Sequence, residues 1–185
     1  MNSNKIFTMQ RSNIVFEILK MVAVSIFVGL CIEAGGLLVN FFFSLYKPEM
    51  VSRLYQKLDL SVLYAQNKWL FFSMYSFILV ISVLKVVLFY IVMVLVIKID
   101  LSRPFNSFVS GKILQISYYT LSIGLLSYIA RQSAKRVTQP GLSIENLNQF
   151  WEDSQAFILM AAVVYIIALI FKRGVAIQNE NDLTV

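Results

Sequence analysis

Four long apolar runs constrain the fold of this 185-residue chain more than any other feature. The runs cover about residues 21–46, 69–97, 113–129 and 157–171. A helix needs about 20 mainly apolar residues to cross the roughly 30 Å hydrocarbon core of a bilayer. The first two runs reach that length alone, and the last two reach it with their flanking residues. The predicted spans are about 20–46, 69–97, 112–131 and 154–172. The sequence therefore predicts an all-α, polytopic membrane protein. It forms one domain, residues 1–185, in which a bundle of four transmembrane helices carries short interfacial helices.

The composition agrees with a membrane protein and excludes several kinds of chemistry. Hydrophobic residues make up 58% of the chain and charged residues 14%, a balance that soluble domains rarely show. There is no histidine, which is the commonest general base and the commonest metal ligand. The sequence contains no phosphate-binding loop, metalloprotease helix or nucleophile elbow. The one cysteine, Cys31, lies inside the first span, and we interpret it as a small packing residue. We therefore expect no catalytic residue, no metal and no cofactor.

The basic residues mostly bracket the predicted spans. The formal net charge is +6, which in a soluble domain would suggest nucleic acid. Beside spans, Lys and Arg instead contact lipid headgroups, so we expect no direct contact with nucleic acid. Four spans place both termini on one side, and the basic residues on the two sides number eight and seven, too close to decide the orientation. The basic cluster Arg131, Lys135 and Arg136 argues against cytoplasmic termini. Lys172 and Arg173 beside the last span, and the lack of a translocation signal, favour cytoplasmic termini in a bacterial inner membrane.

Two connections between the predicted spans carry apolar stripes at helical spacing. The stripe in the first connection consists of Val51, Leu54, Tyr55 and Leu58. In the last connection a helix is expected to begin near Ile144, with Leu147, Phe150 and Trp151 on its apolar face. We predict that both helices lie in the membrane interface. Aromatic residues at the same end of the spans are predicted to form an interfacial belt. They are Tyr46, Tyr64, Trp69 and Trp151.

Two charged residues lie deep inside predicted spans, Glu33 in the first and Lys85 in the second. Each is 13 residues from a basic residue on the terminal side, Lys20 or Lys98, so both lie about 20 Å deep at 1.5 Å per residue. Because consecutive spans are antiparallel neighbours, we predict that the two side chains meet as a buried charge pair. Such a pair either fixes the helix register or belongs to a polar cavity that binds a ligand. The remaining alternative is that one of them snorkels or is neutral.

Small residues follow one face of the third span and one face of the first. In the third span they are Ser117, Thr120, Gly124 and Ser127. In the first span Ser25 and Gly29 have small-xxx-small spacing, and Gly35 and Gly36 follow. Small residues let helices approach closely in lipid, where apolar burial alone does not drive association. We interpret both faces as helix-packing surfaces, and the alternative for the third span is that it lines a polar path.

Two segments resemble a known family. The first follows the second span and reads Ser102-Arg103-Pro104-Phe105-Asn106. The second is the ending, Glu180-Asn181-Asp182-Leu183-Thr184-Val185. With the number and order of spans, they resemble domain of unknown function 2975, a family of small bacterial four-span membrane proteins. One departure is Ala176-Ile177-Gln178-Asn179, where that family is expected to be more acidic. The resemblance implies no known activity. It does imply a partner, because such families commonly occur with a small Cro/CI-like helix-turn-helix regulator.

The leading hypothesis is a non-enzymatic membrane protein that binds a cytoplasmic partner and responds to the state of the membrane. The expected docking residues lie in the loop and the tail on one side of the membrane. They are Pro104, Phe105, Asn106, Glu180, Asn181, Asp182, Leu183 and Val185. The alternative is a small transporter or ligand-binding protein that uses a polar site at Glu33 and Lys85. An intramembrane enzyme is disfavoured, since histidine and catalytic motifs are absent. The lipid bilayer is an expected partner in every case, and the sequence is compatible with a homo-oligomer.

Overall fold

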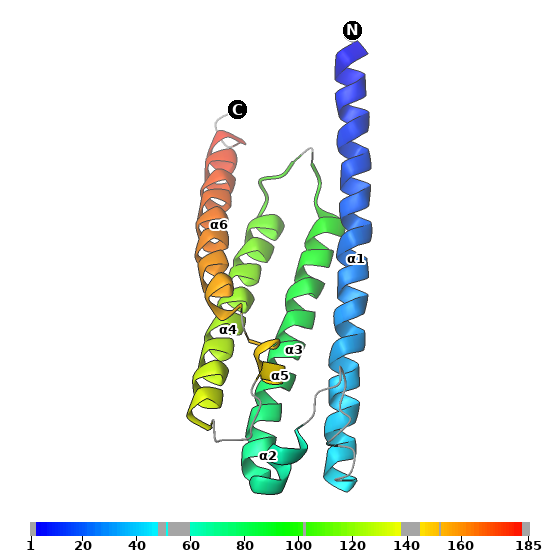
Figure 1. Ribbon diagram of the computed structural model, residues 1–185. Coiled ribbons are helices and arrows are strands. Elements are labelled where there is room, and N and C mark those ends of the chain that lie inside the picture. The colour runs from blue at the N-terminus through cyan, green and yellow to red at the C-terminus, as the bar shows by residue number, and fades with distance from the viewer. Residues whose placement is uncertain are drawn as a thin grey trace.

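The protein is built from helices, as the apolar runs predict. The computed structural model describes residues 3–47, 51, 60–101, 103–137, 145–151 and 153–182. Within these residues the long helices are α1 (Ser3–Tyr46), α3 (Lys68–Lys98), α4 (Ser107–Val137) and α6 (Ser154–Asp182). Two short helices, α2 (Ser61–Gln66) and α5 (Glu145–Asn148), lie between them (Figure 1). Each long helix contains a stretch that is long and apolar enough to cross a membrane. The predicted all-α, multi-pass membrane fold is therefore confirmed.

The helices extend beyond the predicted spans because hydropathy marks only the part that lies in hydrocarbon. The first helix begins at Ser3, well before its apolar stretch starts at Ile14. At the other end of the chain, α6 continues to Asp182, so most of the expected polar tail is helical. Two helix starts have side-chain caps. Asn67 accepts hydrogen bonds from the backbone N–H groups of Trp69 and Leu70 at 3.0 and 3.3 Å, which satisfies donors that a helix leaves unpaired.

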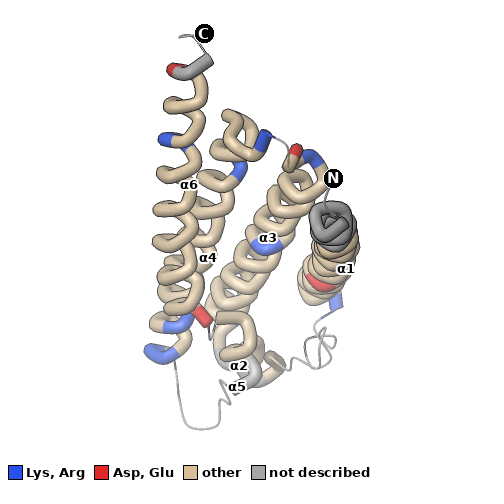
Figure 2. Tube along the Cα trace, turned by 90° about the horizontal axis from the view of Figure 1, so that it is seen from above, with Lys and Arg blue, Asp and Glu red and all other residues tan. Residues whose placement is uncertain are grey.

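The four long helices pack in the order in which they follow one another along the chain. Helix α1 packs on α3, α3 on α4, and α4 on α6, and Figure 2 shows this succession from above. The closest pair is α4 with α6. A Cβ atom placed on Gly124 of α4 would lie 2.7 Å from Ile158 Cγ1 and 3.0 Å from the Ile158 backbone nitrogen. Only a residue without a side chain permits this approach, so Gly124 sets the distance between the two helices.

The small residues of α4 behave as predicted, and those of α1 do not. Ser117, Thr120 and Ser127 are all buried. The hydroxyls of Ser117 and Thr120 donate to carbonyl oxygens of their own helix, each at 2.7 Å, so their burial leaves no donor unpaired. In α1 a Cβ atom on Gly29 would meet nothing within 4 Å. Cys31 is exposed as well, so it is not a packing residue within this chain. The predicted packing face is confirmed for the third span, whereas Gly29 in the first span contacts no other helix of this chain.

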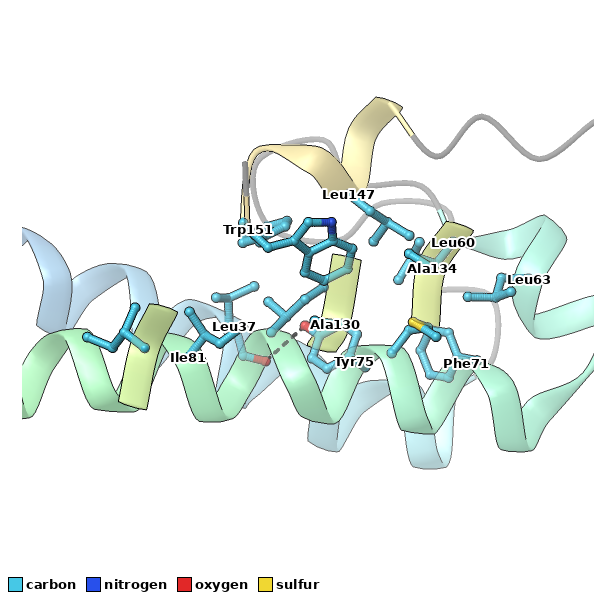
Figure 3. Close-up of a cluster of buried hydrophobic side chains, with 14 of the residues drawn as sticks. Leu37, Leu60, Leu63, Phe71, Tyr75, Ile81, Ala130, Ala134, Leu147 and Trp151 are labelled. Carbon is cyan, nitrogen blue, oxygen red and sulfur yellow. Dashed lines mark hydrogen bonds between the residues drawn. The ribbon is translucent and has the colours of Figure 1, made fainter. Parts of the chain in front are cut away.

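The hydrophobic core occupies the half of the molecule away from the termini. There, side chains from α1, α3 and α4 meet residues of the connecting segments. The buried cluster contains Leu37, Val51, Leu60, Leu63, Phe71, Met74, Tyr75, Ile78, Ile81, Leu88, Ile123, Ala130, Ala134, Leu147, Phe150 and Trp151. In Figure 3 the hydroxyl of Tyr75 on α3 donates to the backbone carbonyl oxygen of Leu37 on α1, at 3.0 Å. This bond gives the buried phenol a partner where lipid offers none.

The segment around Trp151 belongs to this core, which corrects one prediction. Trp151 was expected in the interfacial belt, but only 1% of it is exposed, and it lies in the same buried cluster as Ala130 and Leu37 (Figure 3). Leu147 in α5 is buried too, so the apolar face predicted for this short helix packs on the core of the chain. Irregular backbone beside membrane-spanning helices is tolerated where protein covers it, and the folded-in segment meets that condition.

The rest of the belt and the first predicted interfacial helix have different outcomes. Tyr46 and Trp69 are 83% and 86% exposed, as residues of an interfacial belt should be. Leu54, Tyr55 and Leu58, which carry most of the predicted stripe, lie outside the described residues. The described helix in this connection, α2, begins at Ser61 instead, and Leu63 on it is buried in the core.

Candidate functional site

Lys85 lies on the face of α3 that packs into the core. The buried residues around it on the helix are Met74, Ile78, Ile81 and Leu88. Lys85 continues their spacing of three and four residues, so its neighbours on this face are apolar except for the buried Ser82. Its side chain is half-buried. A charge at such a position is rare in a membrane helix and marks the first place to look for function.

The side chain of Lys85 lines a small cavity between α3, α4 and the start of α6. The cavity has a volume of about 10 Å³. Its polar lining residues are Lys85, Ser127, Gln149, Asp153 and Ser154. The hydroxyl of Ser154 is buried and has no hydrogen-bond partner within the described chain. A volume of this size holds about one water molecule, and the surrounding polar groups offer that water several partners.

Glu33 does not take part in this site. In the described structure no hydrogen bond or ion pair joins Glu33 to Lys85. Two ring contacts, each with centroids 6.0 Å apart, set the register between α1 and α3: Phe27 meets Tyr90, and Phe41 meets Phe72. In this register Glu33 lies about one helical turn, roughly 5 Å, from the level of Lys85.

The direction of the two side chains separates them further. Lys85 lines the cavity beside α4 and α6, whereas α1 packs against α3. The structure therefore does not bring the predicted pair together. It brings Lys85 to the cavity that Asp153 and Ser154 also line. Depth along a single span does not predict this arrangement. One sequence feature could have predicted this position. Lys85 falls in line with the apolar stripe of α3, which indicates a side chain directed into the core.

The cavity has the size and the polar lining to hold a water molecule beside the charged side chain of Lys85. Lys85 supplies a cation and Asp153 an anion, and the space between the lining groups is about that of one water molecule. No hydrogen bond joins Lys85 to Ser127 or Ser154 in the described structure, so the geometry of an activated serine is not formed. Among the described residues, no group of three or more acidic or cysteine side chains could hold a metal ion. Lys85 is half-buried, and a water in this space would hydrate its charge.

The predicted docking loop rests on the last long helix. The ring of Phe105 lies 5.1 Å, centroid to centroid, from the ring of Phe171 on α6. A Cβ atom on Gly174 would lie 2.7 Å from the Phe105 ring, so the missing side chain of this glycine makes room for the phenyl group. Phe105 nevertheless stays 42% exposed. The loop thus presents an aromatic side chain whose ring packs on α6 and is still partly exposed.

Asn106 has a structural role that the sequence analysis did not assign. Its side-chain oxygen accepts a hydrogen bond from the backbone N–H of Val109 at 2.9 Å, and its side-chain nitrogen donates to the carbonyl oxygen of Arg103 at 3.0 Å. These bonds make Asn106 the N-cap of α4. Pro104, two residues earlier, is half-buried in the same loop. The loop therefore has a defined shape that its own hydrogen bonds maintain.

The tail residues are only partly described. Glu180 lies on α6 and is exposed. The helix includes Asn181 and Asp182, whose side chains lie outside the described part of the chain, as do Leu183 and Val185 altogether. Gly174, which contacts Phe105, is six residues before Glu180, or about 9 Å along the helix. The structure thus brings the loop to α6 itself, and contact with the final residues stays a prediction.

Comparison of the chain with protein-family models, with curated proteins and with solved structures found no match.

Proposed function

We propose that this integral membrane protein is non-enzymatic and binds a partner protein at the end where both termini lie. The observation that carries the proposal is the position of Phe105. The ring is anchored on Phe171 and Gly174, and 42% of the residue is still exposed. A rigid, exposed aromatic side chain suits a binding anchor, because little conformational entropy is lost when a partner covers it.

The nature of the partner follows from the side of the membrane and from the resemblance. We place both termini in the cytoplasm of a bacterial cell because of the basic residues beside the last span, and the proposed partner is then a cytoplasmic protein. Arg103 in the loop and Lys172 and Arg173 on α6 give this end a positive charge. The resemblance to domain of unknown function 2975 makes a small Cro/CI-like helix-turn-helix regulator the first partner to test. Binding of such a regulator would depend on the state of the membrane if α6 shifts relative to the loop.

The size of the cavity makes the alternative function, transport or solute binding at Glu33 and Lys85, less attractive. The two residues are not joined, and the cavity beside Lys85 has room for about one water molecule. A transported solute would need a larger space than this. The cavity is better suited to hydrating Lys85 inside the protein.

The test is copurification from native membranes with a tagged protein. We expect one soluble protein to copurify with the natural sequence and to be lost with Phe105→Ala, which removes the exposed ring. Phe43→Ala is the matched control. Phe43 is 48% exposed, but it lies at the end of α1 that is away from the termini and from Phe105. Deletion of residues 180–185 separates the contribution of the tail from that of the loop.

Equal capture by the natural protein, Phe105→Ala and Phe43→Ala would contradict the proposal. Loss with Phe43→Ala alone would place the partner at the other end of the molecule. A change in the thermal midpoint of Phe105→Ala should be measured in parallel, so that loss of folding is not mistaken for loss of binding.

A further inference from the structure

A long groove runs along the outer seam between α4 and α6. It consists of two neighbouring cavities of about 520 and 370 Å³. Tyr118 and Tyr165 line both cavities, so the two spaces adjoin at this pair of rings. The groove lies on the membrane-spanning stretches of both helices. It is separate from the Lys85 cavity and shares none of its lining residues.

The groove exists because α4 and α6 carry small residues along this seam. The side chains of Gly111 on α4 and of Ala161, Ala162 and Ala168 on α6 are too small to fill the bottom of the groove. Larger side chains form its walls, among them Leu114, Leu121 and Leu169. The rings of Tyr118 and Tyr165 have centroids 6.4 Å apart and are tilted by 37°, and both residues are partly exposed. The groove therefore presents an apolar channel with two aromatic rings at its middle.

The two ends of the groove differ in polarity. The end near the termini is lined by Ser107, Ser110, Lys172 and Asn179. This end also contains the first turn of α4, where the helix dipole gives a partial positive charge. The other end, around Leu121 and Ile158, is almost entirely apolar. One end thus suits an anion, and the rest suits hydrocarbon.

The groove is long enough to hold an extended acyl chain. Ile158 and Lys172 are separated by 14 residues of α6. At 1.5 Å per residue this is about 21 Å. This is more than half of a hydrocarbon core of about 30 Å, so the groove covers the leaflet at Lys172 and continues past the middle of the bilayer. A molecule with a charged head at Lys172 and a chain extending to Ile158 would lie in its natural orientation in the membrane.

We propose that this groove binds one phospholipid with an anionic headgroup. Lys172 and the hydroxyl of Ser107 contact the phosphate, and an acyl chain lies along the seam past Tyr118 and Tyr165. The charge of Lys172 and the polarity gradient of the groove favour an anionic lipid over a zwitterionic one. The bound lipid would stabilise the α4–α6 pair at the end where α6 also supports Phe105.

The test is native mass spectrometry of the full-length protein in detergent, with added phosphatidylglycerol or phosphatidylcholine. We expect one phosphatidylglycerol to bind more tightly than phosphatidylcholine. Lys172→Ala should weaken binding of phosphatidylglycerol about five-fold, which corresponds to about 1 kcal/mol for one basic residue beside an anionic lipid. Arg173→Ala is the matched control, since it removes the same charge at the same depth from a residue outside the groove.

A second pair of variants tests the apolar part of the groove. Ala162 is exposed in the groove, so Ala162→Phe should fill it without disturbing the α4–α6 contact and should weaken binding of both lipids. Val163→Phe places the same ring on the neighbouring exposed position outside the groove and should bind lipid normally. Equal affinity of the natural protein for the two lipids would overturn the proposal. Equal effects of Lys172→Ala and Arg173→Ala would do so too. A dimer that Ala162→Phe dissociates would show that a second copy covers the groove.

Discussion

At the scale of single residues, the direction of a side chain decides its role. Glu33 and Lys85 have similar depths along the chain, yet Lys85 lines a cavity beside α4 and α6 and is not bonded to Glu33. A change at one of these residues should therefore have little influence on the effect of a change at the other. Charges that share no partner usually contribute independently to stability.

The first prediction concerns this independence. In a double-mutant cycle with Glu33→Gln and Lys85→Met, we expect the free energies of unfolding to add within about 0.5 kcal/mol. The reason is that no hydrogen bond or ion pair joins the two residues in the described structure. Unfolding in detergent micelles, followed by circular dichroism, measures the four variants. A coupling energy of about 2 kcal/mol or more would show that the two charges interact after all.

The second prediction uses the two tryptophans as a matched pair. Trp151 is 1% exposed and Trp69 is 86% exposed. We expect Trp151→Ala to lower the free energy of unfolding by about 3–5 kcal/mol, as for other large core residues. Trp69→Ala should change it by about 0.5 kcal/mol or less. Similar destabilisation by both substitutions would mean that Trp151 does not lie in the core, and quenching of the remaining tryptophan in each variant provides an independent check.

At the scale of helices, close approach is confined to the positions where a neighbour actually lies. Gly124 and Gly29 both sit in small-residue patterns that predict packing. Gly124 faces Ile158 of α6, whereas nothing lies within 4 Å of a Cβ atom on Gly29. The pattern indicates where a helix is able to approach, and the arrangement of the helices determines where one does.

The third prediction compares these two glycines. Gly124→Ala should destabilise the protein by about 1–3 kcal/mol, since the new methyl group would overlap Ile158 and push α4 away from α6. Gly29→Ala should be neutral or stabilising by up to about 1 kcal/mol, because alanine is the better helix former. Thermal midpoints of the two variants in the same detergent give the comparison. If Gly29→Ala is the more damaging change, the exposed face of α1 is in contact with another molecule.

At the scale of the whole molecule, the long helices form a succession from α1 to α6 rather than a ring in which all four meet. Helix α1 makes its main contacts with α3, and the described structure has no comparable contact between α1 and α6. Figure 1 shows both termini at the end of the molecule where the connection between α3 and α4 also lies. The core fills the opposite end.

The fourth prediction concerns the orientation in the membrane. We expect both termini in the cytoplasm, given the basic residues beside the last span. Single cysteines would be introduced in a Cys31→Ser background at Lys68 and at Asn179, which are exposed at opposite ends of the helices. An impermeant thiol reagent should label position 68 in intact cells and position 179 only after lysis. The reverse pattern would place the Phe105 surface outside the cell and rule out a cytoplasmic partner there.

The sequence by itself determined that the lipid bilayer surrounds the protein, that the fold is all-α, and approximately where the four spans lie. These properties depend on local hydropathy, because lipid offers no partner to an open backbone and helices satisfy their own hydrogen bonds. The packing face of the third span could also be predicted from the chain, and so could the position of the Pro104–Asn106 loop at the same end as the tail. In these cases one face or one connection is enough to give the answer.

Only the tertiary structure decided which residues meet. Position along a helix gives depth at about 1.5 Å per residue, but each residue also turns the side chain by about 100°, so a small change of packing redirects it. This is why Lys85 lines a cavity with Asp153 and Ser154, which follow it by more than 60 residues, and is not joined to Glu33. Trp151 lies in the core for the same reason. Its apolar surface is covered by residues of the buried cluster that are distant in the sequence, and no local pattern records that contact.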